Sequence, residues 1–188
     1  MGTVSAAESV RLDTRLFRID TRSLVGSVLL GLVFVLVQQV AHRIDVLISP
    51  ALVIIGGVTW ATFTGLVVLL YRQPAGLITA EVAAFVAVAT GLSPLAMFFI
   101  PANGLGSITY SLVSRRLPMR TRLHHLIPQI FTNLVGNACV AVGLKVVLHL
   151  PWSLILIAAA ITSAAGIIGG TLLTHLVYNA VIKSGVTE

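Results

Sequence analysis

The chain has 188 residues, of which 57% are hydrophobic and 10% are charged, with a formal net charge of +6 and a mean hydropathy of +1.02. Soluble domains carry about 25% charged residues, so this composition indicates an integral membrane protein. The length leaves room for about six spanning helices of ~20 residues, and none for a folded ATPase, kinase or DNA-binding domain. The single cysteine, Cys139, excludes an internal disulfide and cannot alone build a metal site.

The chain begins with a polar arm, residues 1–22, in which Leu12, Leu16 and Ile19 recur at helical intervals. This spacing predicts a short amphipathic helix on the membrane surface, with a disordered tail as the alternative. The apolar stretch that follows is longer than the core of a cleaved signal peptide, so we interpret it as the first span. Six spans are predicted, at 23–41, 47–70, 75–92, 95–113, 124–148 and 153–182.

The predicted fold is therefore an all-α integral membrane protein: a cytoplasmic arm, a six-helix transmembrane domain over residues 23–182, and a cytoplasmic tail at 183–188. Only Arg43 and Lys145, of 12 Lys and Arg residues, fall on the side away from the termini. Positively charged loops stay in the cytoplasm, so both termini are predicted to lie inside, an N-in/C-in topology. The excess of positive charge is thus explained by the membrane topology, and no nucleic-acid partner is predicted.

Glu81 is the one acidic residue within an apolar run of these predicted spans. It lies between Tyr71 and Gly106, a stretch that holds two predicted helices joined by an uncharged turn. An ionisable carboxylate is costly inside a membrane span, so such a residue is a functional hypothesis by default. Glu81 is predicted either to contact a ligand or to hold the bundle together through a neighbouring polar side chain.

Small residues recur every four positions in two of the spans. In lipid, helices associate through close backbone approach, so both series are predicted to be helix-contact faces. The alternatives are packing within the chain and docking to another membrane subunit. The residues concerned are Ser23, Ser27 and Gly31 in the first span, and Gly166 and Gly170, flanked by Thr162 and Thr174, in the sixth.

Uncharged polar residues within the spans are the other candidates for a site. Because Gln38 and His42 are four residues apart, they are predicted to share a helix face. The alternative for amides is ordinary hydrogen bonding between helices. The full set predicted to converge on a substrate pocket open to the outside is Gln38, Gln39, His42, Trp60, Glu81, Asn103 and Asn137.

Enzyme signatures are absent from the sequence: there is no His-Glu-x-x-His, Gly-x-Ser-x-Gly or Walker motif. The pair His124 and His125 has no carboxylate or thiolate near it in the sequence, which argues against a metal site there. We therefore predict no catalytic residue, no bound metal and no cofactor.

The chain resembles a family of substrate-binding membrane subunits. Small six-helix proteins with both termini inside, a small-residue series on the first helix and no ATPase are similar to the S components of energy-coupling factor (ECF) transporters. One set of positions, between about residues 50 and 140, is similar in spacing to the thiamine/hydroxymethylpyrimidine (YkoE-like) type: Arg72-x-Pro74, Glu81, Pro94 and Gly104-Leu105-Gly106. The sequence departs from that type at Val88, where a second carboxylate is expected.

The resemblance implies a multi-pass protein of the bacterial cytoplasmic membrane that takes up a vitamin or related micronutrient, thiamine or its pyrimidine precursor being the named expectation. Such an S component binds its substrate from the outside, under loops near 42–50 and 91–95. It then docks on a transmembrane coupling (T) subunit driven by two ATPase subunits, and topples to deliver the ligand. The small-residue series, Ser23, Ser27 and Gly31 with Gly166 and Gly170, would make the subunit contact.

Two other function classes remain open at this point. One is a non-transporting membrane subunit, an assembly or regulatory partner whose polar residues only join helices. The other is an autonomous small transporter, although the sequence has no inverted repeat and no run of pore-lining charge.

Overall fold

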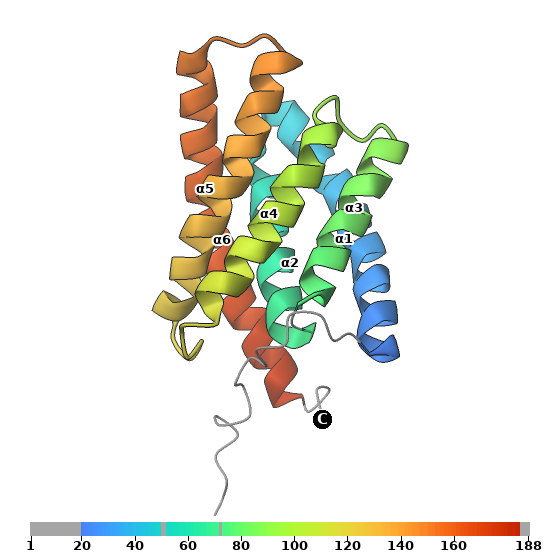
Figure 1. Ribbon diagram of the computed structural model, residues 1–188. Coiled ribbons are helices and arrows are strands. Elements are labelled where there is room, and N and C mark those ends of the chain that lie inside the picture. Colours follow the sequence, from blue (N-terminus) through green and yellow to red (C-terminus); the bar gives the residue numbers. More distant parts are fainter. Residues whose placement is uncertain (1–19, 50–51, 72, 185–188) are drawn as a thin grey trace, which may run out of the picture.

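The computed structural model describes residues 20–49, 52–71 and 73–184, and all regular structure in these ranges is helical (Figure 1). The predicted arm up to residue 19, Arg72 and the tail from residue 185 lie outside the described residues. Five of the helices are long and apolar enough to cross a membrane, while α3 is a shorter apolar helix of 15 residues. The helices are α1 Thr21–Ile48, α2 Ile54–Tyr71, α3 Ala75–Ala89, α4 Ala96–Ser114, α5 Arg122–Val146 and α6 Trp152–Lys183.

The boundary between the first two helices was predicted wrongly, whereas the other helix ends lie within a few residues of the prediction. Helix α1 continues past His42 and Arg43 to Ile48, and α2 begins at Ile54 instead of near residue 47. The reason is Asp45, whose carboxylate lies on the buried face of α1 and accepts hydrogen bonds from two backbone N–H groups at the start of α2. A helix end needs such acceptors, and a charged side chain does not by itself end a helix.

Helix α2 lies at the centre of the bundle. It contacts all five other helices, which form an open ring around it in the order α1, α3, α4, α5, α6. Figure 1 shows α2 behind α3 and α4, with α1 at one edge and α5 and α6 at the other. A central helix needs side chains small enough for close approach on several faces, and α2 supplies them with Gly56, Gly57, Ala61 and Gly65.

The contact between α2 and α6 joins two series of small residues. A Cβ atom on Gly57 would lie 3.1 Å from a methyl group of Thr162, and one on Gly65 would lie 2.8 Å from the Thr174 hydroxyl. Larger side chains at these glycines would separate the two helices. The small-residue series of α6 is therefore used inside the chain.

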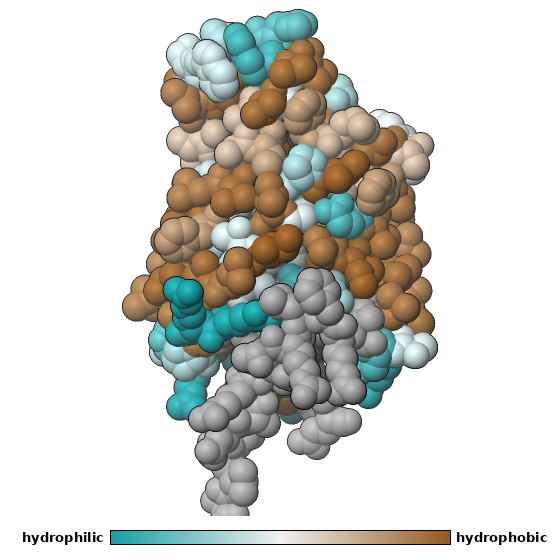
Figure 2. All heavy atoms as spheres, viewed as in Figure 1, coloured by the Kyte–Doolittle hydropathy of each residue, from teal (hydrophilic) through white to brown (hydrophobic). Residues whose placement is uncertain are grey.

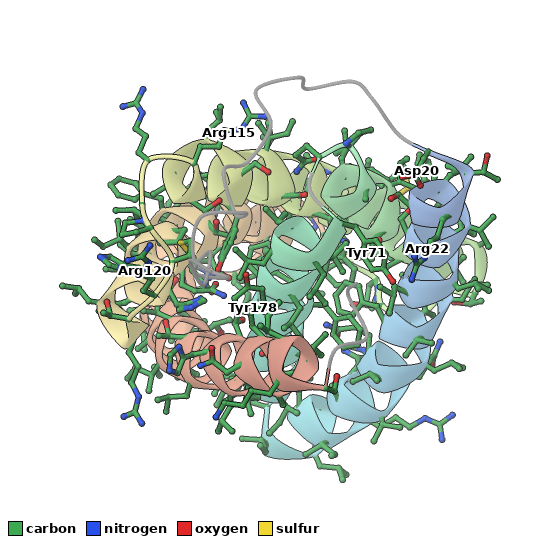
Figure 3. The ribbon with its side chains drawn as sticks, turned by 90° about the horizontal axis from the view of Figure 1, so that it is seen from below. Asp20, Arg22, Tyr71, Arg115, Arg120 and Tyr178 are labelled. Atoms are coloured by element: carbon green, nitrogen blue, oxygen red, sulfur yellow. The ribbon has the colours of Figure 1, made fainter. Side chains whose placement is uncertain are left out.

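The two ends of the bundle differ in chemistry. We call the end with the α1–α2, α3–α4 and α5–α6 connections the cavity end, and the opposite one the arginine end. Figure 3 looks onto the arginine end, where Arg22, Arg115 and Arg120 lie around the helix termini. Here Asp20 begins α1 by accepting a 2.6 Å hydrogen bond from the backbone N–H of Ser23, which holds the pKa of this exposed carboxyl below its usual range.

Between the ends, the surface is apolar. Figure 2 shows a broad hydrophobic band over the helices, bordered by hydrophilic residues at both ends. Large aliphatic side chains project from it, among them Leu36 on α1, which is 68% exposed, and Leu156 and Leu176 on α6, each 65% exposed. A soluble monomer rarely exposes so large an apolar area, so the band fits contact with lipid chains.

Candidate ligand-binding site

A cavity lies among the helices toward the cavity end, and all six helices contribute to its wall. Its enclosed volume is about 70 Å³, and about 650 Å³ is free of atoms when the part open to solvent is counted. The enclosed part has room for several water molecules. The cavity is therefore a candidate site for a small ligand.

Small residues create this space. Helix α3 faces the cavity with Ala83, Ala84 and Ala87, α2 with Gly56 and Gly57, and α5 with Gly136. Alanine and glycine fill little volume, so helices that meet through them near the middle of the bundle leave a gap where no long side chain enters. The cavity thus follows in part from the positions of these small residues in three separate helices.

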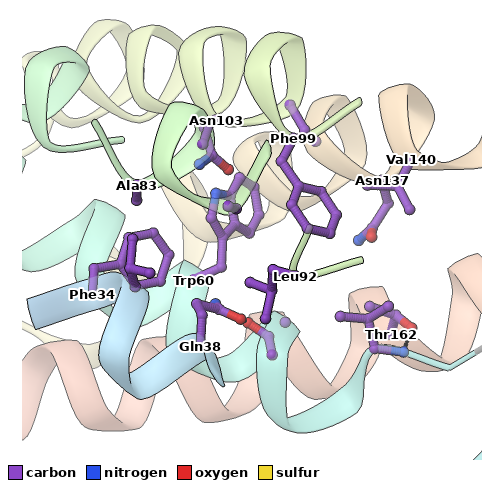
Figure 4. Close-up of a pocket in the computed structure, with 18 residues that line it drawn as sticks. Phe34, Gln38, Trp60, Ala83, Leu92, Phe99, Asn103, Asn137, Val140 and Thr162 are labelled. Carbon is purple, nitrogen blue, oxygen red and sulfur yellow. Dashed lines mark hydrogen bonds between the residues drawn. The ribbon is translucent and has the colours of Figure 1, made fainter. Parts of the chain in front are cut away.

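Aromatic rings form part of the wall. Figure 4 shows the rings of Trp60 and Phe99 between Asn103 on one side and Gln38 and Thr162 on the other. Phe34 also lines the cavity and stacks on Phe63 at a centroid distance of 4.8 Å. The Trp60 indole fits against Gly106 and Gly136, where any Cβ atom would touch the ring. The two glycines therefore fix the position of this side chain.

Three amide side chains supply most of the polar groups, beside the Thr162 hydroxyl and the Trp60 indole N–H, which has no hydrogen-bond partner among the described residues. The Gln38 side-chain NH2 donates to the carbonyl of Gly56 and to the Thr59 hydroxyl, both at 3.0 Å. The Asn103 NH2 donates to the Ala80 carbonyl at 2.8 Å, which joins α4 to α3. The Asn137 NH2 donates to the Ser163 hydroxyl, also at 2.8 Å, which joins α5 to α6. Each amide is thus held in place by its donor group.

The structure brings together four of the seven residues predicted to bind substrate. Gln38, Trp60, Asn103 and Asn137, from four different helices, line the same cavity. Gln39 and His42 are half-buried on α1 but do not line it. The buried face of α1 continues from Phe34 through Gln38 to Ala41 and Asp45, so His42 lies at its edge.

Glu81 lies outside the cavity, at the contact between α3 and α4. Its Oε1 atom packs directly against Gly104, and its Oε2 atom is buried without a hydrogen-bond partner among the described residues. Gly104 therefore serves the packing of Glu81. Neither predicted role is shown at this position, because Glu81 does not line the cavity and no described side chain forms a hydrogen bond with it.

The predicted subunit-contact residues also lie in contacts within the chain. Ser27 is 0% exposed, and its carbonyl accepts a 2.8 Å hydrogen bond from the Thr79 hydroxyl of α3. A Cβ atom on Gly31 would lie 2.8 Å from Val82 of the same helix. In α6, Gly166 packs against Asn133, and Gly170 packs against Ala61 and Gln129. Ser23, near the start of α1, is half-buried. Internal packing, left open by the sequence, is what the structure displays.

A buried polar face of α5 was only partly anticipated. His125, Gln129 and Asn133 recur every four residues, each 0% exposed, on the arginine side of Asn137. Gln129 donates to the Ala61 carbonyl at 2.8 Å, and the His125 ring meets that of His175 edge-on at 5.1 Å. The spacing of four residues between these polar side chains was the feature of the sequence from which this face could have been predicted. The face joins α5 to α2 and α6 beneath the cavity.

The fold is that of a helical, multi-pass membrane protein, and it contains an internal cavity toward one end of the bundle. No metal-binding cluster of His, Cys, Asp and Glu occurs among the described residues. No protein-family model, curated protein or solved structure matches this chain at a significant level.

Proposed function

We propose that this protein is the substrate-binding membrane subunit of an uptake system, an S component of an ECF-type importer for a vitamin or related micronutrient. The observation that carries the proposal is the convergence of Gln38, Trp60, Asn103 and Asn137 on one cavity. These residues were selected from the sequence as polar or aromatic groups inside apolar spans. The three amides also join helices through their NH2 groups, and their position around one common space supports a second role in binding a ligand.

The proposal includes six membrane spans with both termini inside. Helix α3 would then also cross the membrane, which brings the number of spans to six. Its 15 residues extend only about 22 Å, which is less than the thickness of an average hydrocarbon core. The short helix and its turns fit a local thinning of the bilayer. Under this topology the cavity end faces outward, and the cavity receives its ligand from outside the cell.

The chain has no nucleotide-binding motif, so ATP-driven uptake through it would need an ATPase in another protein. In this proposal the source is a coupling subunit with two ATPase subunits. Because Ser27 and Gly31 are covered by α3, docking would use the exposed apolar faces of the bundle, and the small residues would influence it only through helix packing.

Affinity purification of the tagged chain from its own membranes in a mild detergent tests this proposal. We expect a stoichiometric complex with one other multi-pass protein and with two subunits that bind ATP. The same chain in liposomes should accumulate no ligand by itself. Transport by the isolated chain would favour the autonomous transporter, and binding only to an unrelated membrane protein would favour the assembly subunit.

A further inference from the structure

We propose that the cavity selects an uncharged ligand with a single planar ring that donates hydrogen bonds from N–H or O–H groups. The inference rests on the proposed function only in treating this cavity as the ligand site. Four properties of the wall carry it: its lack of charge, its aromatic rings, the direction of its amide hydrogen bonds and its size.

The first property is charge. None of the described residues that line the cavity is Asp, Glu, Lys, Arg or His. The buried carboxylates do not line it either, since Asp45 accepts from the backbone of Ile55 and Gly56, and Glu81 packs against Gly104 at the contact between α3 and α4. An anionic ligand would lose its hydration and find no counter-charge in the wall, which is strongly unfavourable, and a cation would find only ring faces and amide oxygens in place of a carboxylate.

The second property is the arrangement of rings. Trp60 and Phe99 project into the same space, and Phe34 lies in the wall opposite α4 with its ring already stacked on Phe63. Aromatic side chains pack best on flat partners in offset or edge-on geometry. A planar ring can use these surfaces, whereas a bulky non-planar ligand cannot.

The third property is hydrogen-bond direction. The NH2 groups of Gln38, Asn103 and Asn137 all donate to protein acceptors. Their carbonyl oxygens accept no hydrogen bond from any described residue, so the amides offer the ligand mainly acceptors. A ligand that carries N–H or O–H donors satisfies them, and one without donors leaves them unpaired.

The fourth property is size. At about 10–15 Å³ for each water, the enclosed 70 Å³ has room for roughly five to seven waters. This space suits a small ligand with one ring better than a ligand with two. Thiamine, the expectation taken from the resemblance, has two rings and a permanent positive charge, so it is predicted to bind poorly.

Four related compounds test the inference by isothermal titration of the purified chain in nanodiscs. Nicotinamide is neutral and donates through its amide, 1-methylnicotinamide is a permanent cation, nicotinate is an anion, and N,N-dimethylnicotinamide has no N–H donor. We expect nicotinamide to bind at least about 100-fold more tightly than either ion, and about tenfold more tightly than the dimethylated amide. Equal binding of an ion, or no binding of nicotinamide, would overturn the inference.

Variants locate the binding. Asn137→Leu and Gln38→Leu should each weaken nicotinamide binding about tenfold. Asn179→Leu is the matched control, because this amide lies near the arginine end of α6 and contacts His175 instead of the cavity. Thermal unfolding of every variant separates lost binding from lost folding, and Gln38→Leu decides the matter should Asn137→Leu fail to fold. Equal weakening by the control would also overturn the inference.

These results are distinguishable from the fate of the proposed function. Selective binding of the neutral ring by a chain that never associates with a coupling subunit or ATPases would retain the ligand class and remove the importer. Association with those subunits by a chain that prefers the cation would retain the importer and remove the ligand class.

Discussion

The carboxylate of Asp45 and the backbone N–H of Gly56 form a hydrogen bond of 2.8 Å that connects the last turns of α1 to the first turn of α2. The other carboxylate oxygen accepts from Ile55 at 2.7 Å, and the carbonyl of Gly56 in turn accepts from Gln38. One buried acidic residue thus positions the central helix and, through it, a polar side chain of the cavity.

Replacing Asp45 with alanine should lower the free energy of unfolding by about 2 kcal/mol, because two N–H groups at the start of α2 lose their charged acceptor. Thermal or denaturant unfolding in detergent measures the change. Asp20→Ala is a matched control, since Asp20 also begins a helix but is exposed, and it should have a smaller effect. Equal effects at the two positions would contradict the role given to Asp45.

Replacing Gly31 with leucine should destabilise the isolated chain by about 1–3 kcal/mol, since the new side chain would overlap Val82 and the carbonyl of Thr79. Leu36→Ala, on the exposed face of the same helix, should leave stability nearly unchanged. If Gly31→Leu left the isolated chain as stable as wild type but blocked its association with another subunit, that result would support the subunit-contact prediction.

Trp60 should report directly on the cavity. In the Trp152→Phe background it is the remaining tryptophan, and its emission should be blue-shifted and poorly quenched by acrylamide because the indole is enclosed by Gly106 and Gly136. Gly136→Ala, which places a methyl group against the ring, should shift the emission and weaken ligand binding. Unchanged emission in Gly136→Ala would argue against the close contact.

Glu81→Gln should leave ligand affinity within about twofold, since Glu81 does not line the cavity. The neutral amide also removes the cost of a carboxylate near lipid, so stability should be unchanged or higher. Asn103→Leu serves as the comparison, because Asn103 does line the cavity and should lose affinity. A large loss of affinity in Glu81→Gln would return Glu81 to the ligand site.

The sequence predicted the helices well because membrane spans are read from long apolar runs, and it selected Gln38 and Asn137 because an amide stands out in such a run. The same logic could not select Phe34 or Phe99, since apolar side chains give no such signal in a membrane helix. The sequence also could not show whether the Glu81 side chain faces the cavity or the contact between α3 and α4. That choice depends on how α3 and α4 pack, with Gly104 leaving room beside the carboxylate.

Asp45 shows a different limit. From sequence it belongs to a polar connection after His42 and Arg43, where a carboxylate is usually solvated. The structure extends α1 through this region and buries Asp45, because the start of α2 offers two N–H groups that need an acceptor. The partner lies only ten residues along the chain, yet the pairing becomes visible only once the helix is known to continue.

Native mass spectrometry of the tagged chain, released gently from its own membranes, tests most directly the central claim that the cavity holds a small-molecule ligand. We predict that wild type retains a small neutral metabolite and that Asn137→Leu, otherwise folded, loses it. A wild-type chain that carries no small molecule under mild conditions, even when its cells are grown on varied nutrients, would contradict the claim and favour a subunit whose polar residues only join helices.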